Sequence, residues 1–154
     1  LGLLVAAFGL WAVLYAALGP ARLGVWTLPA WTIPSGWCLA VAGLAVIAIA
    51  QAQMGASWRI GIDDAPTELV TVGLYRWVRN PIYSGIFLGG LGALLATPSP
   101  WLLGGAALGY LGVAFQTRRE EEHMRRLHGR RFEDWARRVG RFVPLCGRLD
   151  GGQS

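Results

Sequence analysis

Four apolar segments constrain the fold of this chain more than any other feature. They cover residues 1–18, 37–53, 82–96 and 101–115. The first is just long enough to cross a bilayer, and residues 97–100 divide the last two. Pro98 and Pro100 favour a tight reversal there, because proline breaks helices. The pattern predicts an all-α polytopic membrane protein with about four transmembrane helices, the last two forming a hairpin whose short arms extend into their flanks.

The composition supports the same class. Apolar residues fill 54% of the 154 positions and charged residues 15%, against about 25% charged residues in an ordinary soluble domain. The mean hydropathy is +0.42. Residues 1–18 carry no positive n-region, so we expect a span there rather than a signal peptide. One membrane domain is predicted over residues 1–148, followed by a disordered tail at residues 149–154.

The chain contains no lysine, so all 14 of its Lys and Arg residues are arginines. The loop between the first two spans holds Arg22 alone and the 97–100 turn holds none, whereas all the others lie between spans two and three or after span four. By the positive-inside rule, both termini are expected to be cytoplasmic, in a plasma membrane or bacterial inner membrane. Beside apolar spans, this charge indicates anionic membrane lipid as a partner rather than nucleic acid.

Polar groups cluster at both ends of the predicted hairpin. Arg79, Asn80 and Tyr83 stand where its first arm begins, and Glu120 to Glu122 follow its second arm. Such groups are costly near a bilayer core, and antiparallel arms return the chain to the same membrane face. We therefore expect one site on the cytoplasmic face, with charges of both signs beside aromatic rings. Such a site suits a zwitterionic, aromatic ligand.

A purely structural interpretation remains open for each half of this cluster. Pro81 fits the first turn of a helix and disfavours the helical region at Asn80, so Asn80 is expected to cap the third span. Arg79 would then only snorkel to the interface. The three glutamates would form a solvated salt-bridge network with neighbouring arginines.

After residue 115 the chain becomes polar. Apolar residues recur there at spacings near three and four, the pattern of an amphipathic helix that lies on the inner membrane surface or covers the site. They are Met124, Leu127, Phe132, Trp135, Val139 and Phe142. His123 and His128 are five residues apart, which does not place two ligands on one helical face, so no metal site is indicated.

Two motifs and an aromatic tail follow one another in the second half of the chain. They are Gly73, Tyr75, Arg79, Pro81, Tyr83 and Gly85, then Glu120 and Glu121, then Gly129, Phe132, Trp135 and the ending Arg141, Phe142, Val143 and Pro144. These residues and their spacing resemble the isoprenylcysteine carboxyl methyltransferase family and its phospholipid methyltransferase relatives. The resemblance covers residues 58–144, with Asn80 where many members carry histidine, and Phe132 and Trp135 where they carry tyrosine.

The resemblance implies a methyltransferase that uses S-adenosyl-L-methionine, bound at the cytoplasmic membrane face. We expect Arg79 to be the catalytic residue that orients a carboxylate of a lipophilic acceptor such as a prenylcysteine, with Arg118 or Arg119 as alternatives. The enzyme would then be an O-methyltransferase. Backbone contacts to the cofactor are implied for Leu69 and Val70, and its polar groups are assigned to Glu121. The implied cofactor-binding residues are Leu69, Val70, Gly73, Tyr75, Asn80, Pro81, Tyr83, Glu120 and Glu121.

Two other functions are consistent with the sequence. Sterol reductases resemble the same C-terminal region but use NADPH, and a non-catalytic four-span scaffold would use the polar groups only for capping and snorkelling. The methyl acceptor is also open among a prenylcysteine, another lipid carboxylate, a phospholipid amine and a thiol. The oligomeric state is undetermined.

Overall fold

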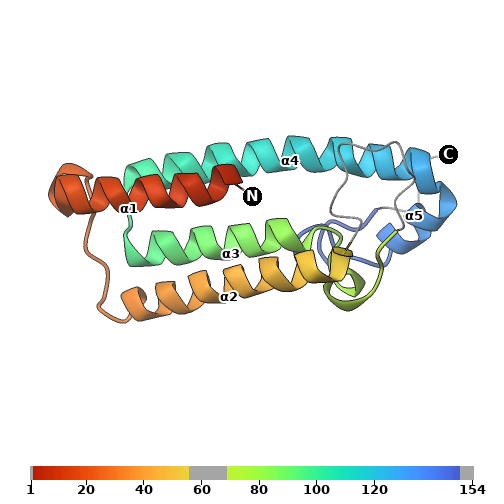
Figure 1. Ribbon diagram of the computed structural model, residues 1–154, viewed down its shortest axis with the longest axis horizontal. Coiled ribbons are helices and arrows are strands. Elements are labelled where there is room, and N and C mark those ends of the chain that lie inside the picture. The colour runs from red at the N-terminus through yellow and green to blue at the C-terminus, as the bar shows by residue number, and fades with distance from the viewer. Residues whose placement is uncertain (1, 56–68, 150–154) are drawn as a thin grey trace.

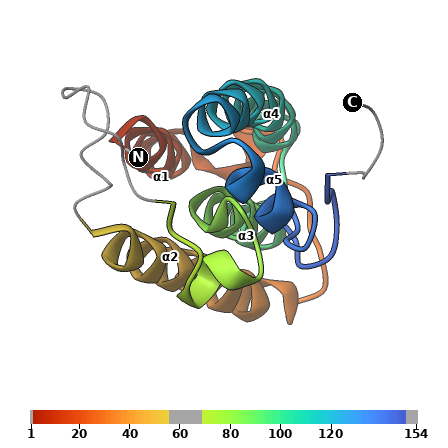
Figure 2. The ribbon, with the colours of Figure 1, turned by 90° about the vertical axis from the view of Figure 1, so that its right-hand side faces the viewer.

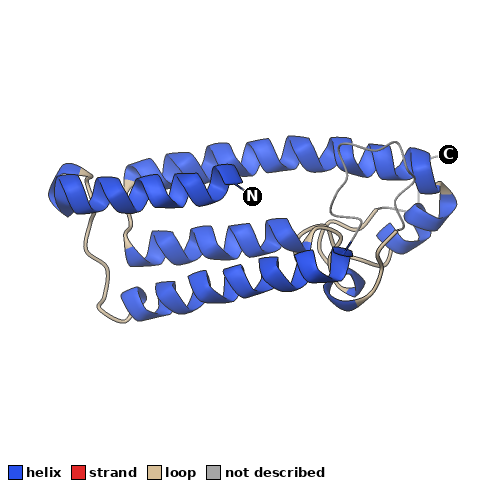
Figure 3. Ribbon diagram, viewed as in Figure 1, coloured by secondary structure: helices blue, strands red, loops and turns tan. Residues whose placement is uncertain are grey.

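The computed structural model describes residues 2–55 and 69–149. The regular elements there are α1 (Gly2–Arg22), α2 (Thr32–Met54), the 3₁₀ helix η2 (Gly73–Arg76), α3 (Pro81–Ala96), α4 (Pro100–His128) and α5 (Arg130–Ala136). The four long helices run along the long axis (Figure 1), and the described part of the chain contains no strand (Figure 3). An all-α fold is therefore confirmed for these residues. The tail predicted at residues 149–154 lies, apart from Leu149, outside them.

The helix α2 is the one described helix that is long and apolar enough to cross a membrane by length and composition. Its 23 residues reach about 34 Å at 1.5 Å per residue. One face of α2 exposes Trp37, Val41 and Leu44, each about two thirds accessible. Exposed apolar residues on a long helix indicate contact with lipid rather than with water.

Glycines bring α2 and α3 into close contact. Figure 2 shows α3 between α2 and α4, and α3 packs along most of α2 but meets α4 at few positions. A Cβ atom added to Gly43 would lie 2.5 Å from the carbonyl oxygen of Gly85, and one added to Gly36 equally close to that of Gly92. Small residues allow helix backbones to approach in this way. Gly105 and Gly109 of α4 have no such neighbour within 4 Å among the described residues.

Replacing Gly85 with alanine should destabilise the protein by about 1–3 kcal/mol. Its Cβ would lie 2.6 Å from the Gly43 carbonyl oxygen and 2.7 Å from Ile47 Cγ1, so the two helices must separate. Gly89→Ala is the matched control, because a Cβ there meets nothing within 4 Å. Thermal unfolding in detergent should show a lower Tm for Gly85→Ala and an unchanged or slightly higher one for Gly89→Ala. Equal Tm values would contradict the packing.

The predicted hairpin is present and turns at residues 97–100. The hydroxyl of Ser99 accepts a hydrogen bond from the Leu102 amide at 3.2 Å, and Pro100 occupies the first turn of α4. The helix α3 has 16 residues and reaches only about 24 Å, whereas α4 has 29 residues and reaches about 44 Å. The hairpin therefore extends beyond its apolar segments through α4, and α4 carries its glutamates past the start of α3.

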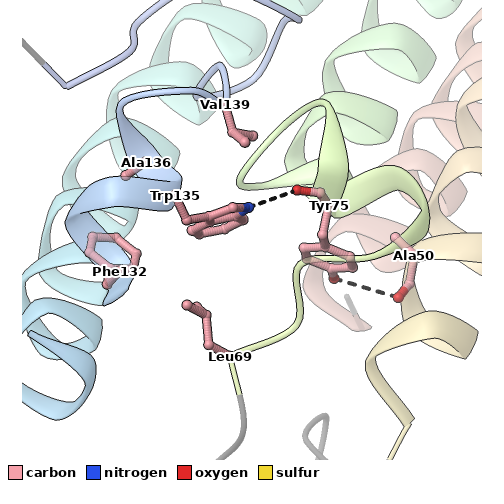
Figure 4. Packing of buried hydrophobic residues seen from close by; sticks show 7 residues of the cluster. All are labelled: Ala50, Leu69, Tyr75, Phe132, Trp135, Ala136 and Val139. Atoms are coloured by element: carbon pink, nitrogen blue, oxygen red, sulfur yellow. Dashed lines mark hydrogen bonds between the residues drawn. The ribbon is translucent and has the colours of Figure 1, made fainter. Parts of the chain in front are cut away.

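The C-terminal amphipathic helix predicted from residue 124 to residue 142 is wrong as a single element. The helix α4 continues to His128, and the chain then breaks at Gly129, whose φ of +50° lies in the left-handed region. The seven residues of α5 follow. Phe132 and Trp135 of α5 are buried with Leu69 and Tyr75 in one apolar cluster (Figure 4). Of the spaced apolar residues, Phe132, Trp135 and Val139 are thus buried, whereas Leu127 is exposed.

Candidate functional site

The two polar halves of the hairpin meet, and their centre is an ion triad of Arg79, Glu121 and Arg141. Arg79 Nε donates to Glu121 Oε1 at 2.9 Å. Arg141 donates to both carboxylate oxygens of Glu121, from Nε at 3.1 Å and from Nη2 at 2.6 Å. The Arg79 side chain is 1% exposed and the Glu121 side chain 10%. One buried carboxylate is therefore shared by two arginines.

Arg79 also binds the backbone of the C-terminal segment. Its Nη1 donates to the carbonyl oxygens of Ala136 at 2.6 Å and Val139 at 3.1 Å, and its Nη2 donates to that of Gly147 at 2.7 Å. Burial lowers the pKa of Arg79, while the neighbouring carboxylate of Glu121 opposes that shift. The guanidinium thus connects α4, the end of α5 and the following loop.

Backbone pairing holds that C-terminal loop against the segment before α3. The Arg79 amide donates to the Gly140 carbonyl at 2.8 Å, and the Gly140 amide donates to the Trp77 carbonyl at 3.2 Å. The Asn80 amide adds a bond of 3.1 Å to the Arg141 carbonyl. Val78 and Gly140 form an isolated parallel bridge. This pairing sets Arg141 beside Arg79, 62 residues earlier in the chain.

Asn80 precedes α3, as expected, but its side chain does not cap the helix. Its backbone adopts φ −128° and ψ 64° and no side-chain cap bond forms; the amide Nδ2 instead donates to the Arg141 carbonyl at 3.4 Å. The predicted side-chain cap is therefore wrong, because the C-terminal loop occupies the space beside the helix start. Ser84 Oγ lies 3.1 Å from the Asn80 carbonyl oxygen and 2.6 Å from the Phe142 carbonyl oxygen, so its single proton is shared between these two acceptors. Pro81 begins α3 and is fully buried.

The three consecutive glutamates have three different environments. Glu121 lies in the ion triad, while Glu122 is exposed and pairs with Arg126 on the surface of α4. Glu120 is half-buried, and its Oε1 accepts from the Tyr83 hydroxyl at 3.2 Å and from Gln116 Nε2 at 3.0 Å. Among the residues that the structure describes, its hydrogen-bond partners are thus neutral. Glu120 is the carboxylate of the three whose charge is not already balanced by a bonded arginine.

Three other residues predicted to bind the cofactor, Leu69, Val70 and Tyr75, lie in or against the apolar cluster rather than in the ion triad. Tyr75 is buried in the apolar cluster, where Trp135 Nε1 donates to its carbonyl at 3.2 Å (Figure 4). Its hydroxyl donates to the Ala50 carbonyl at 3.5 Å, and burial raises its pKa to about 12. Leu69 belongs to the same cluster, and Val70 packs against it.

Gly73 has a structural reason of its own to be glycine. Its φ is +61°, and an added Cβ would collide with the side chain of Gln53. Gln53 Oε1 accepts from the Leu74 amide at 2.8 Å, which fixes the start of η2 against the end of α2. In this geometry Gly73 serves the loop that carries Tyr75 and Arg79.

Several residues of the site escaped the sequence interpretation. Arg141 belonged to a motif without an assigned role, and Gly140 and Ser84 carried no recognisable signal. Thr117 lies one helical turn before Glu121 on α4 and is fully buried, yet its Oγ1 has no hydrogen-bond partner among the described residues. The spacing of four residues between Thr117 and Glu121 places both on one face of the helix, and this was the signal that could have identified Thr117.

The arrangement can bind opposite charges at once. Glu120 offers an uncompensated carboxylate, and the Arg141 side chain is 29% exposed while its Nε and Nη2 hold Glu121. The rings of Tyr83 and Phe142 meet edge to face, with 6.4 Å between centroids. Charged and aromatic groups therefore meet where α3, the shortest of the four long helices, begins.

Residues 30–131 match the phospholipid methyltransferase family, and the chain belongs to that family of membrane methyltransferases. Two curated relatives are similar over roughly half of the chain. A methanethiol S-methyltransferase of Crocosphaera subtropica is 29% identical over 86 residues, which cover 56% of this chain and 33% of that protein. The nickel-cobalt-cadmium resistance protein NccN of Alcaligenes xylosoxydans xylosoxydans is 39% identical over 80 residues, covering 51% and 37%.

The fold is also that of a solved membrane enzyme. The eukaryotic intramembrane Ras methyltransferase ICMT (isoprenylcysteine carboxyl methyltransferase) superposes with a TM-score of 0.71 over 95% of this chain and 53% of its own, at 21% identity. The chain thus spans about half the length of this structure and about a third of the two curated relatives. The expected resemblance to the ICMT-like fold is confirmed.

Proposed function

We propose that this protein is a methyltransferase that uses S-adenosyl-L-methionine. The observation that carries the proposal is that two groups lie beside Tyr83 and Phe142: the carboxylate of Glu120, which bonds no arginine among the described residues, and the partly exposed side chain of Arg141. The cofactor contains an ammonium group, a carboxylate and an adenine ring, which are the complements of these three features. Family membership supports the same chemistry.

In this proposal Glu120 binds the cofactor ammonium and Arg141 its carboxylate, while Tyr83 both orients Glu120 and offers a ring face. When bound, the cofactor would supply an electrophilic methyl group on its sulfonium sulfur, and its demethylated product would be S-adenosylhomocysteine. The protein then has to align the acceptor and exclude water. Arg79, first expected to orient an acceptor carboxylate, is more consistent with a positioning residue, because its donors bind this chain's own acceptors.

We place the protein in the membrane as four spans, with both termini and the site at the cytoplasmic face. The exposed arginines of α4 and α5 lie at the end of the bundle that carries the ion triad, while Arg22 is at the opposite end (Figure 1). The positive-inside rule assigns the arginine-rich end to the cytoplasm. The short α3 would let the site lie at the depth of the lipid headgroups, near anionic lipid.

The acceptor in this proposal is an apolar molecule that carries a carboxylate or a thiol. A carboxylate acceptor such as a prenylcysteine follows from the likeness to the carboxyl methyltransferase fold. A thiol acceptor is favoured by the name of the Crocosphaera relative. Neither nucleophile needs a general base once it is ionised. This agrees with the sequence, in which position 80 of the motif is an asparagine and not a histidine.

Calorimetric titration of the purified protein with S-adenosylhomocysteine tests the proposal. Wild-type protein should bind it, and Glu120→Gln should weaken binding about tenfold or more, because a hydrogen bond to a charged group contributes about 1.5–3 kcal/mol. Glu122→Gln is the matched control, since Glu122 is exposed and pairs with Arg126 on the surface. Its affinity should equal that of the wild type.

Two results would count against the proposal. One is binding of NADPH without binding of S-adenosylhomocysteine, which would favour the reductase interpretation. The other is equal affinity of Glu120→Gln and wild type for S-adenosylhomocysteine, which would remove Glu120 from the cofactor site.

A further inference from the structure

Four aromatic rings form a continuous row between α3, α4 and the C-terminal loop. Tyr83 and Phe87 stand one turn apart on α3, Phe142 comes from the loop, and Tyr110 belongs to α4. The Phe142 ring packs edge to face against Tyr83 at 6.4 Å and against Phe87 at 5.2 Å between centroids. Phe87 packs against Tyr110 at 5.7 Å. These separations are those of rings in direct contact, and we call this set the aromatic row.

The row lies where α3 and α4 have little other contact. The helix α3 packs along α2, whereas it meets α4 at few positions. The Tyr83 hydroxyl bonds Glu120 at one end of the row, and Phe87 touches Tyr110 at the other. The Ser84 hydroxyl holds the Phe142 backbone in place. An alkyl chain that runs between α3 and α4 from Glu120 toward Tyr110 would therefore meet these rings.

An unused hydroxyl lies on the Glu120 side of the row. Thr117 is on α4 between Tyr110 and Glu120, is fully buried, and its Oγ1 has no hydrogen-bond partner among the described residues. A buried hydroxyl without a partner is costly, so a ligand with a polar group would be stabilised there. From Tyr110 to Thr117 the helix rises only about 10 Å. That length accommodates a polar head and a few carbons.

We propose that the aromatic row limits the methyl acceptor to a molecule with a short apolar part, such as a short-chain thiol or carboxylate, and excludes a long prenyl chain. Phe87 and Phe142 are the residues that set this limit. The inference rests on the proposed methyltransferase function and narrows its acceptor. It differs from the prenylcysteine acceptor that the resemblance implied.

The test compares ethanethiol with dodecanethiol as acceptors, in wild type and in Phe87→Ala, with S-adenosyl-L-methionine present. In each reaction the thiol sulfur gains the methyl group and loses its proton to the buffer, and S-adenosylhomocysteine is released. Wild type should prefer ethanethiol in kcat/KM. Phe87→Ala should raise kcat/KM for dodecanethiol tenfold or more and leave that for ethanethiol within threefold. For each thiol, kcat/KM of the variant is divided by that of wild type. Any difference between the two thiols in partitioning into detergent micelles then cancels.

A matched control and a second readout accompany this test. Leu108→Ala removes an apolar side chain from α4 that is 72% exposed and outside the row, and it should change neither rate. Without cofactor, calorimetry with dodecyl methyl sulfide should show binding to Phe87→Ala at least tenfold tighter than to wild type. If Phe87→Ala does not fold, Tyr110→Ala opens the row from the α4 side, because Tyr110 contacts Phe87, and it carries the same expectations.

Equal kcat/KM of wild type for the two thiols would overturn the inference, and so would an equal loss of both activities in the folded variants. Either result is distinct from failure of the proposed function itself. That failure would appear as no binding of S-adenosylhomocysteine and no methyl transfer to a thiol or carboxylate of any length.

Discussion

Replacing Glu121 with glutamine is expected to lower the free energy of unfolding by about 3 kcal/mol, since removing one partner of a buried ion pair leaves an uncompensated charge. Two arginines depend on this carboxylate: Arg79 through Nε, and Arg141 through Nε and Nη2. The Arg79 side chain is almost fully buried, so water cannot replace the lost partner. Glutamine keeps one acceptor oxygen but removes the charge.

Thermal unfolding in one detergent measures this effect. A loss of about 3 kcal/mol corresponds to a decrease in Tm of roughly 6–12 °C for a chain of this size. Glu122→Gln is the control, because its pair with Arg126 is on the surface and exposed pairs contribute about 0–1 kcal/mol. If Glu121→Gln unfolds at the wild-type temperature but no longer binds S-adenosylhomocysteine, Glu121 contacts the cofactor directly, as the sequence resemblance implied, and its structural role is refuted.

Gly140→Ala should lower the free energy of unfolding about as much as Glu121→Gln does, for a steric reason. An added Cβ would collide with the Val143 carbonyl oxygen and would lie 2.9 Å from both the Cys146 carbonyl oxygen and the Leu145 amide nitrogen. All three are backbone atoms, so the loop itself must move. The shift would break the pairing of Gly140 with Arg79 and Trp77. We expect a loss of about 3 kcal/mol, at the upper end of overpacking effects.

Gly140→Ala should lower both the Tm and the affinity for S-adenosylhomocysteine. Displacing the loop moves Arg141 away from Glu121, so affinity for S-adenosylhomocysteine should fall at least tenfold. Gly109→Ala provides the control, because a Cβ at Gly109 meets nothing within 4 Å and alanine favours a helix. A Gly140→Ala protein with wild-type Tm and affinity would show that the loop is not packed as described.

The hairpin and the proximity of its polar ends could be predicted from sequence because they depend on local signals. Prolines on both sides of Ser99 force the reversal, and two antiparallel helices must bring Arg79 and the glutamates to one end. The Asn80 cap failed because capping depends on what lies beside the helix. Here the paired C-terminal loop takes the Asn80 amide. The single amphipathic helix failed because Gly129 breaks it, a choice that apolar spacing alone does not reveal.

By itself, the sequence determined that this protein is a helical membrane protein with a charged site at the arginine-rich end of a hairpin, because hydropathy, proline and charge act locally along the chain. Only the tertiary structure decided which of the three glutamates forms no ion pair among the described residues. Glu120, Glu121 and Glu122 are chemically identical and adjacent, yet helical geometry turns Glu121 toward two arginines from distant segments, Glu120 toward Tyr83, and Glu122 toward the surface. Glu121 pairs with arginines 42 and 20 residues away along the chain, and Glu120 bonds Tyr83, 37 residues away. No local pattern encodes those neighbours.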